Sequence, residues 1–168
     1  MNTRPRNSRV EGEKGSPQNK LRYELYKDAF ERIDKSLESE NYFEVVAIVD
    51  SIINDRLTSL LQKTKNEDWD SSLQSVGNII KTILGDIKHK RIEVGDIKDE
   101  FRNLLIKVEK EWVSKRNFVV HSFVVVSLHN QELTKEERLQ IVKECAVEGA
   151  LYARQITNLT GKVVRNLE

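Results

Sequence analysis

The chain of 168 residues fits one domain with room for a sizeable hydrophobic core. Its 28 Lys and Arg residues are nearly balanced by 27 Asp and Glu residues, and the formal net charge of +1 argues against a surface given over entirely to nucleic acid, although a local basic cleft stays compatible with it. The only cysteine, Cys145, excludes an internal disulfide framework and a cysteine-cluster metal site.

Targeting and cofactor signals are not visible in the sequence. The N-terminal arginines have no apolar run behind them, and eighteen consecutive apolar residues occur nowhere, so we expect neither a secretory signal nor a membrane span. Metalloprotease, zinc-ligand and phosphate-loop spacings are missing as well, so we expect no metal and no other cofactor. A cytoplasmic protein is the simplest expectation.

Residues 1–19 are predicted to form a disordered, mildly basic leader, because they carry almost no apolar side chains to offset the entropy of ordering. Both prolines of the chain, Pro5 and Pro17, lie in this leader. The rest of the sequence, residues 20–168, lacks the strongest helix breaker and is predicted to form a single helical domain.

Three helical patterns fill the first half of this domain, over residues 20–38, 40–64 and 71–88, with apolar side chains recurring at i, i+3 and i+4. Ser39, Glu40 and Asn41 are suited to a tight turn between the first two helices. A fourth helix is predicted to start near Asp96, which follows Gly95 and is a plausible N-cap.

A fifth helix is predicted to open with a capping box at Thr134 and Glu137. Alanines at its inward positions 146, 150 and 153 indicate close contact with another helix. Short connections favour antiparallel neighbours, so the predicted fold is all-α, an up-and-down bundle of four to five helices.

Residues 117–128 are rich in β-branched and aromatic side chains, which favour a strand on propensity alone. A lone strand would have no partner, because no second strand-like run occurs in the chain. We therefore expect the end of the fourth helix followed by a buried turn region.

The apolar stripe of the fourth helix predicts an inward side chain at position 115 or 116, and the sequence has Arg116 there. Asn117 and His121 follow, four residues apart and therefore on one helical face. Each of these polar residues alone is explained equally well by snorkelling or by a structural hydrogen bond. The three together, among apolar neighbours, point to a site.

The segment from Lys115 to Ser122 resembles the motif of HEPN domains, in which an Arg is followed by a polar residue, often Asn, and then by a His after four to six residues. The resemblance rests on this short motif and on the helical architecture of residues 20–165. It implies a metal-independent endoribonuclease that is active as a homodimer, with both motifs facing one composite cleft.

By position, the resemblance implies that His121 acts as general base on a ribose 2′-hydroxyl or as general acid on the leaving 5′-oxygen. It implies that Arg116 holds the scissile phosphate, while Asn117 orients the histidine or donates to the same phosphate. The expected product is a 2′,3′-cyclic phosphate, which requires RNA rather than DNA. Lys115 and Ser122, inside the motif, are supporting candidates.

HEPN-like proteins often have an acidic residue on an early helix near the motif. The resemblance therefore makes Asp50 or Asp55 a candidate for ordering Arg116. A solvated edge or a structural ion pair explains either residue equally well. On an ideal helix Arg116 and His121 lie about 140° apart. Their convergence therefore requires a curled arginine, a distorted helix or a site that spans two protomers.

Two further histidines are weaker candidates. His89 lies in a charged loop with Lys88, Lys90 and Arg91 that either contacts phosphates or is simply solvated, and His129 has no partner pattern.

Three functions stay open. The first is a toxin or phage-defence ribonuclease with RNA as substrate and a neutralising partner, such as a small nucleotidyltransferase. The second is a non-catalytic HEPN-like dimer that binds a protein or a nucleotide, and the third is a bundle with an accidental motif match.

Overall fold

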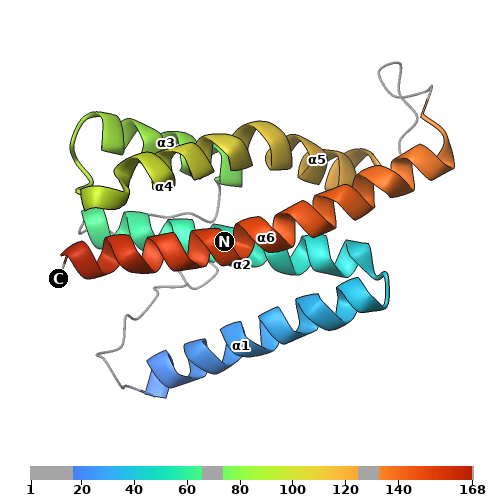
Figure 1. The fold of residues 1–168 in the computed structure, drawn as a ribbon, viewed down its shortest axis with the longest axis horizontal. Helices are drawn as coiled ribbons and strands as arrows, with labels where there is room; N and C mark the ends of the chain where they lie inside the picture. The colour runs from blue at the N-terminus through green and yellow to red at the C-terminus, as the bar shows by residue number, and fades with distance from the viewer. Residues whose placement is uncertain (1–16, 66–73, 125–132, 168) are drawn as a thin grey trace, which may run out of the picture.

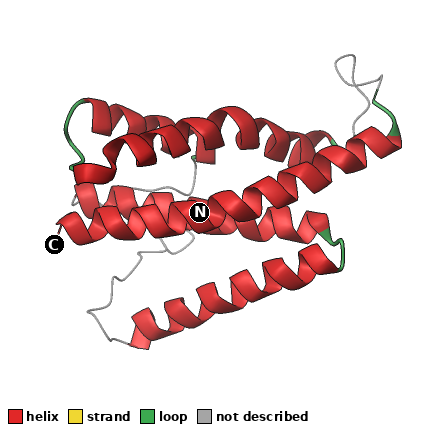
Figure 2. Ribbon diagram, in the orientation of Figure 1, coloured by secondary structure: helices red, strands yellow, loops and turns green. Residues whose placement is uncertain are grey.

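The computed structural model describes residues 17–65, 74–124 and 133–167, and every regular element in these ranges is helical (Figure 2). The expected all-α bundle is therefore confirmed. The elements, in chain order, are α1 (Pro17–Glu38), α2 (Tyr42–Lys65), α3 (Val76–Lys88), the 3₁₀ turn η1 (Gly95–Ile97), α4 (Lys98–Lys107), the π-helical turn η2 (Val108–Trp112), α5 (Val113–Asn117), a second π-helical turn η3 (Phe118–Ser122) and α6 (Lys135–Leu167).

The helices stack in three tiers (Figure 1). The long helices α2 and α6 form the middle tier, α3 and the continuous α4–α5 rod cover one side of it, and α1 lies on the other side, mainly against α2. The middle tier and the tier of α3, α4 and α5 enclose a core of mostly aliphatic side chains with three aromatic ones, Phe101, Trp112 and Tyr152. This burial is the main source of stability in such a bundle.

The predicted turn between the first two helices is confirmed. Glu40 adopts a left-handed backbone with φ of 58°, and the backbone N–H of Asn41 donates to the carbonyl of Ser36 at 2.7 Å. Further along the helices, Asp55 of α2 accepts hydrogen bonds from Arg22 at 2.7 Å and from Tyr26 at 2.5 Å. These bonds fasten the first half of α1 to α2.

The capping box at the start of α6 is also confirmed. The backbone N–H of Glu137 donates to the Thr134 hydroxyl at 3.2 Å, and the Glu137 carboxylate accepts from the backbone N–H of Thr134 at 2.7 Å. Each side chain therefore satisfies a backbone donor that the first helical turn leaves unpaired.

The small residues of α6 permit a close approach, as predicted. Ala146, Ala150 and Ala153 are all buried, and Gly149 lies so close to Trp112 that an added Cβ would be 2.5 Å from the indole nitrogen. That nitrogen donates to the carbonyl of Cys145 at 3.0 Å, so the largest core side chain is held against the backbone of α6.

Three predicted boundaries are wrong. The first helix begins at Pro17, inside the predicted leader. Proline suits a first helical position because it has no N–H to satisfy there. Residues 1–16 lie outside the described ranges. The third helix begins at Val76, since Ser75 caps it by accepting from the backbone N–H of Asn78, and positions 71–73 of its predicted stretch lie outside those ranges. Asp96 does not cap α4.

Gly95 explains the late start of α4. Its backbone is left-handed, with φ of 64°, and it opens the 3₁₀ turn in which Asp96 lies, so that α4 itself begins at Lys98 with no side-chain cap. The turn lets the buried Val94 and the half-buried Ile97 both reach the core. None of the described helices is long and apolar enough to cross a membrane.

The β-branched stretch continues the fourth helix as far as it is described, through α5 and η3 to Ser122. Only Val119 is buried in η3, and Val120 and His121 are exposed. The expected buried turn falls largely on residues 125–132, outside the described ranges.

Candidate functional site

The candidate site lies near the C-terminal end of the α4–α5 rod, called the upper rod below. There α5 passes into the π-helical turn η3. Arg116 and Asn117 are the last residues of α5, and His121 belongs to η3. A π turn pairs backbone groups five residues apart and is underwound relative to an α-helix, so it reduces the offset between Arg116 and His121. The distorted helix that convergence required is therefore present.

Arg116 is held by Asp50 of α2 in a two-point ion pair. Its Nε and Nη2 donate to the two carboxylate oxygens at 2.8 and 2.7 Å, and the side chains are only 19% and 23% exposed. The Nη1 of Arg116 donates to Asn117 Oδ1 at 3.0 Å. Asp50, and not Asp55, is thus the acidic residue that pairs with Arg116.

The guanidinium of Arg116 has N–H donors that neither Asp50 nor Asn117 uses. It has five N–H groups, of which three are used by Asp50 and Asn117, so one N–H on Nη1 and one on Nη2 are left. These two nitrogens form the fork that binds two oxygens of one phosphate. Asn117 accepts through Oδ1 and therefore still has its amide N–H groups to donate.

His121 is exposed and, within the described part of the chain, makes no hydrogen bond or ion pair with Arg116, Asn117 or Asp50. The structure thus brings together three of the predicted residues and leaves the histidine separate. In one protomer, His121 is available to a ligand but is not oriented by the other motif residues.

The supporting candidates have other roles. Asp55 faces α1, where it binds Arg22 and Tyr26, and does not touch Arg116. Asp50 and Asp55 are five residues apart on α2 and so point to different sides of that helix. The backbone carbonyl of Ser122 accepts from Arg138 at 3.4 Å.

Lys115 lies beside α6, where its ammonium group contacts Glu148 at 2.8 Å and Glu144 at 3.3 Å. The hydrogen bond to Glu148, followed by that to Glu144, raises the pKa of Lys115, while Gln140 and Lys115 lower the pKa of Glu144. Both cations of the motif, Lys115 and Arg116, are therefore paired with carboxylates.

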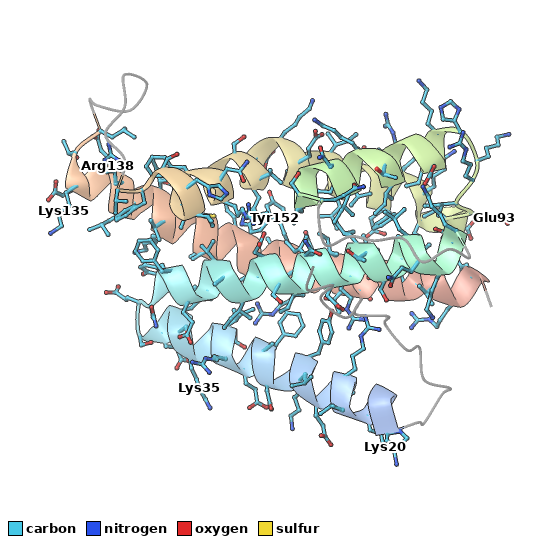
Figure 3. The ribbon with its side chains drawn as sticks, turned by 180° about the vertical axis from the view of Figure 1, so that it is seen from behind. Lys20, Lys35, Glu93, Lys135, Arg138 and Tyr152 are labelled. Atoms are coloured by element: carbon cyan, nitrogen blue, oxygen red, sulfur yellow. The ribbon has the colours of Figure 1, made fainter. Side chains whose placement is uncertain are left out.

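Arg138 is a buried cation that the sequence analysis did not single out. Its Nη1 donates to the carbonyl of Phe123 at 2.9 Å, and its guanidinium lies 5.8 Å from the ring centre of Phe118. It thereby satisfies carbonyls where the rod ends, close to His121, at the end of the bundle where α6 begins (Figure 3). No local pattern around Arg138 predicts the contacts with Ser122 and Phe123, because these residues belong to the end of the rod and not to α6.

No family model, no curated protein and no solved structure matches this chain. The residues and their geometry alone therefore carry the functional argument. In the described ranges, no group of three or more His, Cys, Asp and Glu side chains is arranged to hold a metal ion.

Cys145 and His89 are two further side chains of reactive types, and neither forms a candidate site of its own. Burial raises the pKa of Cys145 to about 12, which leaves its thiol protonated and inert at neutral pH. His89 is an exposed residue at the C-terminal end of α3, and His129 lies outside the described ranges. The motif on α5 and η3 therefore stays the main candidate site.

Proposed function

We propose that the protein is a metal-independent endoribonuclease of the toxin or phage-defence type, which cuts RNA at a cleft shared by two protomers. The observation that carries this proposal is the Asp50–Arg116 ion pair. It fixes a guanidinium with two unused N–H donors beside Asn117 and five residues before the exposed His121.

In the proposed reaction, a 2′-hydroxyl oxygen attacks the adjacent phosphorus and the 5′-oxygen of the next nucleotide leaves. His121 takes the proton of the hydroxyl or returns one to the leaving oxygen, and the two copies in a dimer can divide these roles. Arg116 and the amide of Asn117 stabilise the charge that develops on the phosphate oxygens. The products carry a 2′,3′-cyclic phosphate and a 5′-hydroxyl, and DNA is not a substrate.

A cleft shared by two protomers is supported by the surroundings of His121. Phe43, Val120 and Val124 are 45%, 50% and 86% exposed, which is high for large apolar side chains. Phe43 packs edge-on against Phe123, with ring centres 4.9 Å apart, so these residues border one surface. Exposed apolar patches of this kind mark contact surfaces, and a second copy would bring its own motif to the same place.

A cytoplasmic ribonuclease of this type would damage the RNA of its own cell unless its activity were inhibited. A neutralising partner, such as a small nucleotidyltransferase, would have to block the motif or the shared cleft. Expression of the chain alone is then expected to slow growth, and the His121→Ala variant is expected to relieve that effect.

One observation favours a second candidate, a non-catalytic HEPN-like dimer that binds a protein or a nucleotide. Arg116 is neutralised by Asp50, and Lys115 faces the two carboxylates of Glu144 and Glu148. The motif therefore has little excess positive charge with which to attract RNA. In this case His121→Ala leaves function intact, while changes on the exposed apolar surface abolish it.

The deciding experiment is cleavage of end-labelled total RNA by the purified protein in EDTA, beside the His121→Ala variant. The proposal predicts cleavage by the parent protein only, with cyclic phosphate ends and with both proteins folded and dimeric. Absence of cleavage by a folded, dimeric parent would favour the second candidate.

A further inference from the structure

A second basic surface lies where the upper rod begins, far from the motif. A groove of about 490 Å³ runs between the C-terminal half of α3 and the start of α4. Figure 3 places Glu93, in the loop that joins these helices, at the opposite end of the bundle from Arg138. The groove is lined by Leu84, Gly85, Ile87, Lys88, Lys98, Asp99, Arg102 and Ile106.

Three cations and one carboxylate line this groove. Within residues 17–65, 74–124 and 133–167, Lys88, Lys98 and Arg102 take part in no ion pair, in contrast to Lys81, which binds Glu109 at 3.6 Å. Lys and Arg side chains that no carboxylate neutralises are available to neutralise the phosphates of a nucleic acid. Cations condensed on those phosphates are then released, which is a favourable and salt-dependent contribution to binding.

The walls of the groove indicate which part of a nucleic acid it fits. Leu84, Ile87 and Ile106 are aliphatic, and no aromatic ring lines the groove. Proteins that read single-stranded bases stack them on aromatic side chains. The groove is therefore suited to the sugar-phosphate backbone and not to a base, which argues against a nucleotide pocket.

The groove and the motif lie on the same rod, with the packing contacts of α3 between them. Helix α3 packs on the rod through the Lys81–Glu109 ion pair and then through Gly77, whose added Cβ would lie 3.7 Å from Val113. The Asp50–Arg116 pair lies further along the rod, beyond Val113. Arg102 and Arg116 are fourteen residues apart on the rod, a separation of about 21 Å along a helix axis.

We propose that this groove is a second contact site for the RNA that the motif cuts, holding the backbone a few nucleotides away from the scissile phosphate. The inference rests on the proposed function for its substrate. It also explains how the protein binds RNA although the cations of the motif are paired with carboxylates. The affinity for RNA comes from Lys88, Lys98 and Arg102, while Arg116 binds the reacting phosphate.

The test is the binding of a labelled single-stranded RNA of about twelve nucleotides, long enough to span both sites, as salt is raised. The His121→Ala variant serves as the uncut background, and Lys88→Gln, Lys98→Gln and Arg102→Gln are added to it together. Loss of three phosphate contacts is expected to make the slope of log K against log salt shallower by about 2. For cleavage, the same triple change is also made in the parent protein, which keeps His121. An RNA of about two nucleotides, too short to reach both sites, is expected to be cut equally well by the parent and by this groove variant.

The matched control removes the same number of charges from α1, by Lys20→Gln, Lys27→Gln and Lys35→Gln, all on exposed side chains (Figure 3 labels the first and the last). The control is expected to keep the parental slope. An unchanged slope in the groove variant, an equal loss in the control, or no binding by the background protein overturns the inference.

The same experiment separates this inference from the proposed function. If the parent cuts RNA and the groove variant binds and cuts as well as the parent, the groove is wrong and the ribonuclease stands. If the groove variant loses its salt dependence but the parent cuts nothing, the RNA contact stands and the ribonuclease is wrong.

Discussion

Arg116 is held on one edge by Asp50 and on another by Asn117, and this leaves its remaining donors facing away from the carboxylate. An arginine in such a position has one predetermined geometry for a ligand, whereas an arginine in solvent samples many. Asp50 accordingly acts as a positioning residue in the proposed reaction, because it acts through Arg116 and not on the phosphate.

Asp50→Asn is expected to lower RNA cleavage on the order of a hundredfold, because a neutral amide cannot accept two charge-assisted hydrogen bonds and Arg116 loses its orientation. Because the pair is partly exposed, the free energy of unfolding is expected to fall by only about 1–2 kcal/mol. Single-turnover cleavage and urea unfolding measure the two effects.

The control for Asp50→Asn is the same substitution at Asp55, on the same helix but facing α1. Asp55→Asn is expected to weaken the attachment of α1 and to leave the rate of cleavage unchanged. An equal loss of cleavage in both variants would mean that Asp50 acts only through stability.

Close packing of α6 against Trp112 depends on Gly149, where an added Cβ would lie 2.5 Å from the indole nitrogen and 3.0 Å from Val49. Gly149→Ala is therefore expected to destabilise the protein by about 1–3 kcal/mol in urea unfolding, since neither the indole nor α2 can move without disturbing the core. Gly161→Ala, in the same helix, meets only the end of Arg165 at 4.0 Å and is expected to stabilise by about 0.5–1 kcal/mol. Equal effects of the two substitutions would contradict this explanation.

The start of α6 is expected to be sensitive to acid. The backbone N–H of Thr134, with its hydroxyl second, lowers the pKa of Glu137 below its ordinary value. A lowered pKa in the folded state stabilises the protein above the unfolded-state pKa, about 4.3, and this contribution is lost as pH falls through the lowered value.

Glu137→Gln keeps an acceptor for the cap but has no charge. The parent is expected to melt at a higher temperature than this variant at pH 7, and the difference is expected to vanish at strongly acidic pH. Thermal melts followed by circular dichroism at both pH values measure it, and a difference that does not change with pH would contradict the charge argument.

Most of the bundle follows from local patterns, because apolar periodicity and caps are properties of neighbouring residues. The capping box at Thr134 and the turn at Asn41 are of this kind. The two π-helical turns, both of which contact α6, were not predicted, since apolar periodicity does not distinguish them from a regular α-helix.

The site was predictable only in part, for a related reason. The motif itself is local, but the choice between Asp50 and Asp55 depends on which helices flank α2, and the partners of Lys115 depend on the rotation of α6. Arg138 and the groove cations share this difficulty, since their neighbours are distant in sequence.

The assembly of the proposed site from two protomers makes a prediction for mixed variants. Arg116→Ala and His121→Ala are each expected to be inactive, but equal mixtures that exchange subunits are expected to recover part of the parental activity, because half of the dimers are mixed and bring one intact Arg116 and one intact His121 to the shared cleft. No recovery from folded, exchanging dimers would place Arg116 and His121 of one chain in the same site.

Reaction through the 2′-hydroxyl is tested by comparing an RNA oligonucleotide with the same sequence lacking every 2′-hydroxyl, both incubated with the parent protein in EDTA. Only the RNA is expected to be cut, its fragments are expected to end in 2′,3′-cyclic phosphate, and His121→Ala is expected to cut neither. Cutting of both strands, or cutting by the His121→Ala variant at the parental rate, would contradict a reaction through the 2′-hydroxyl at this motif.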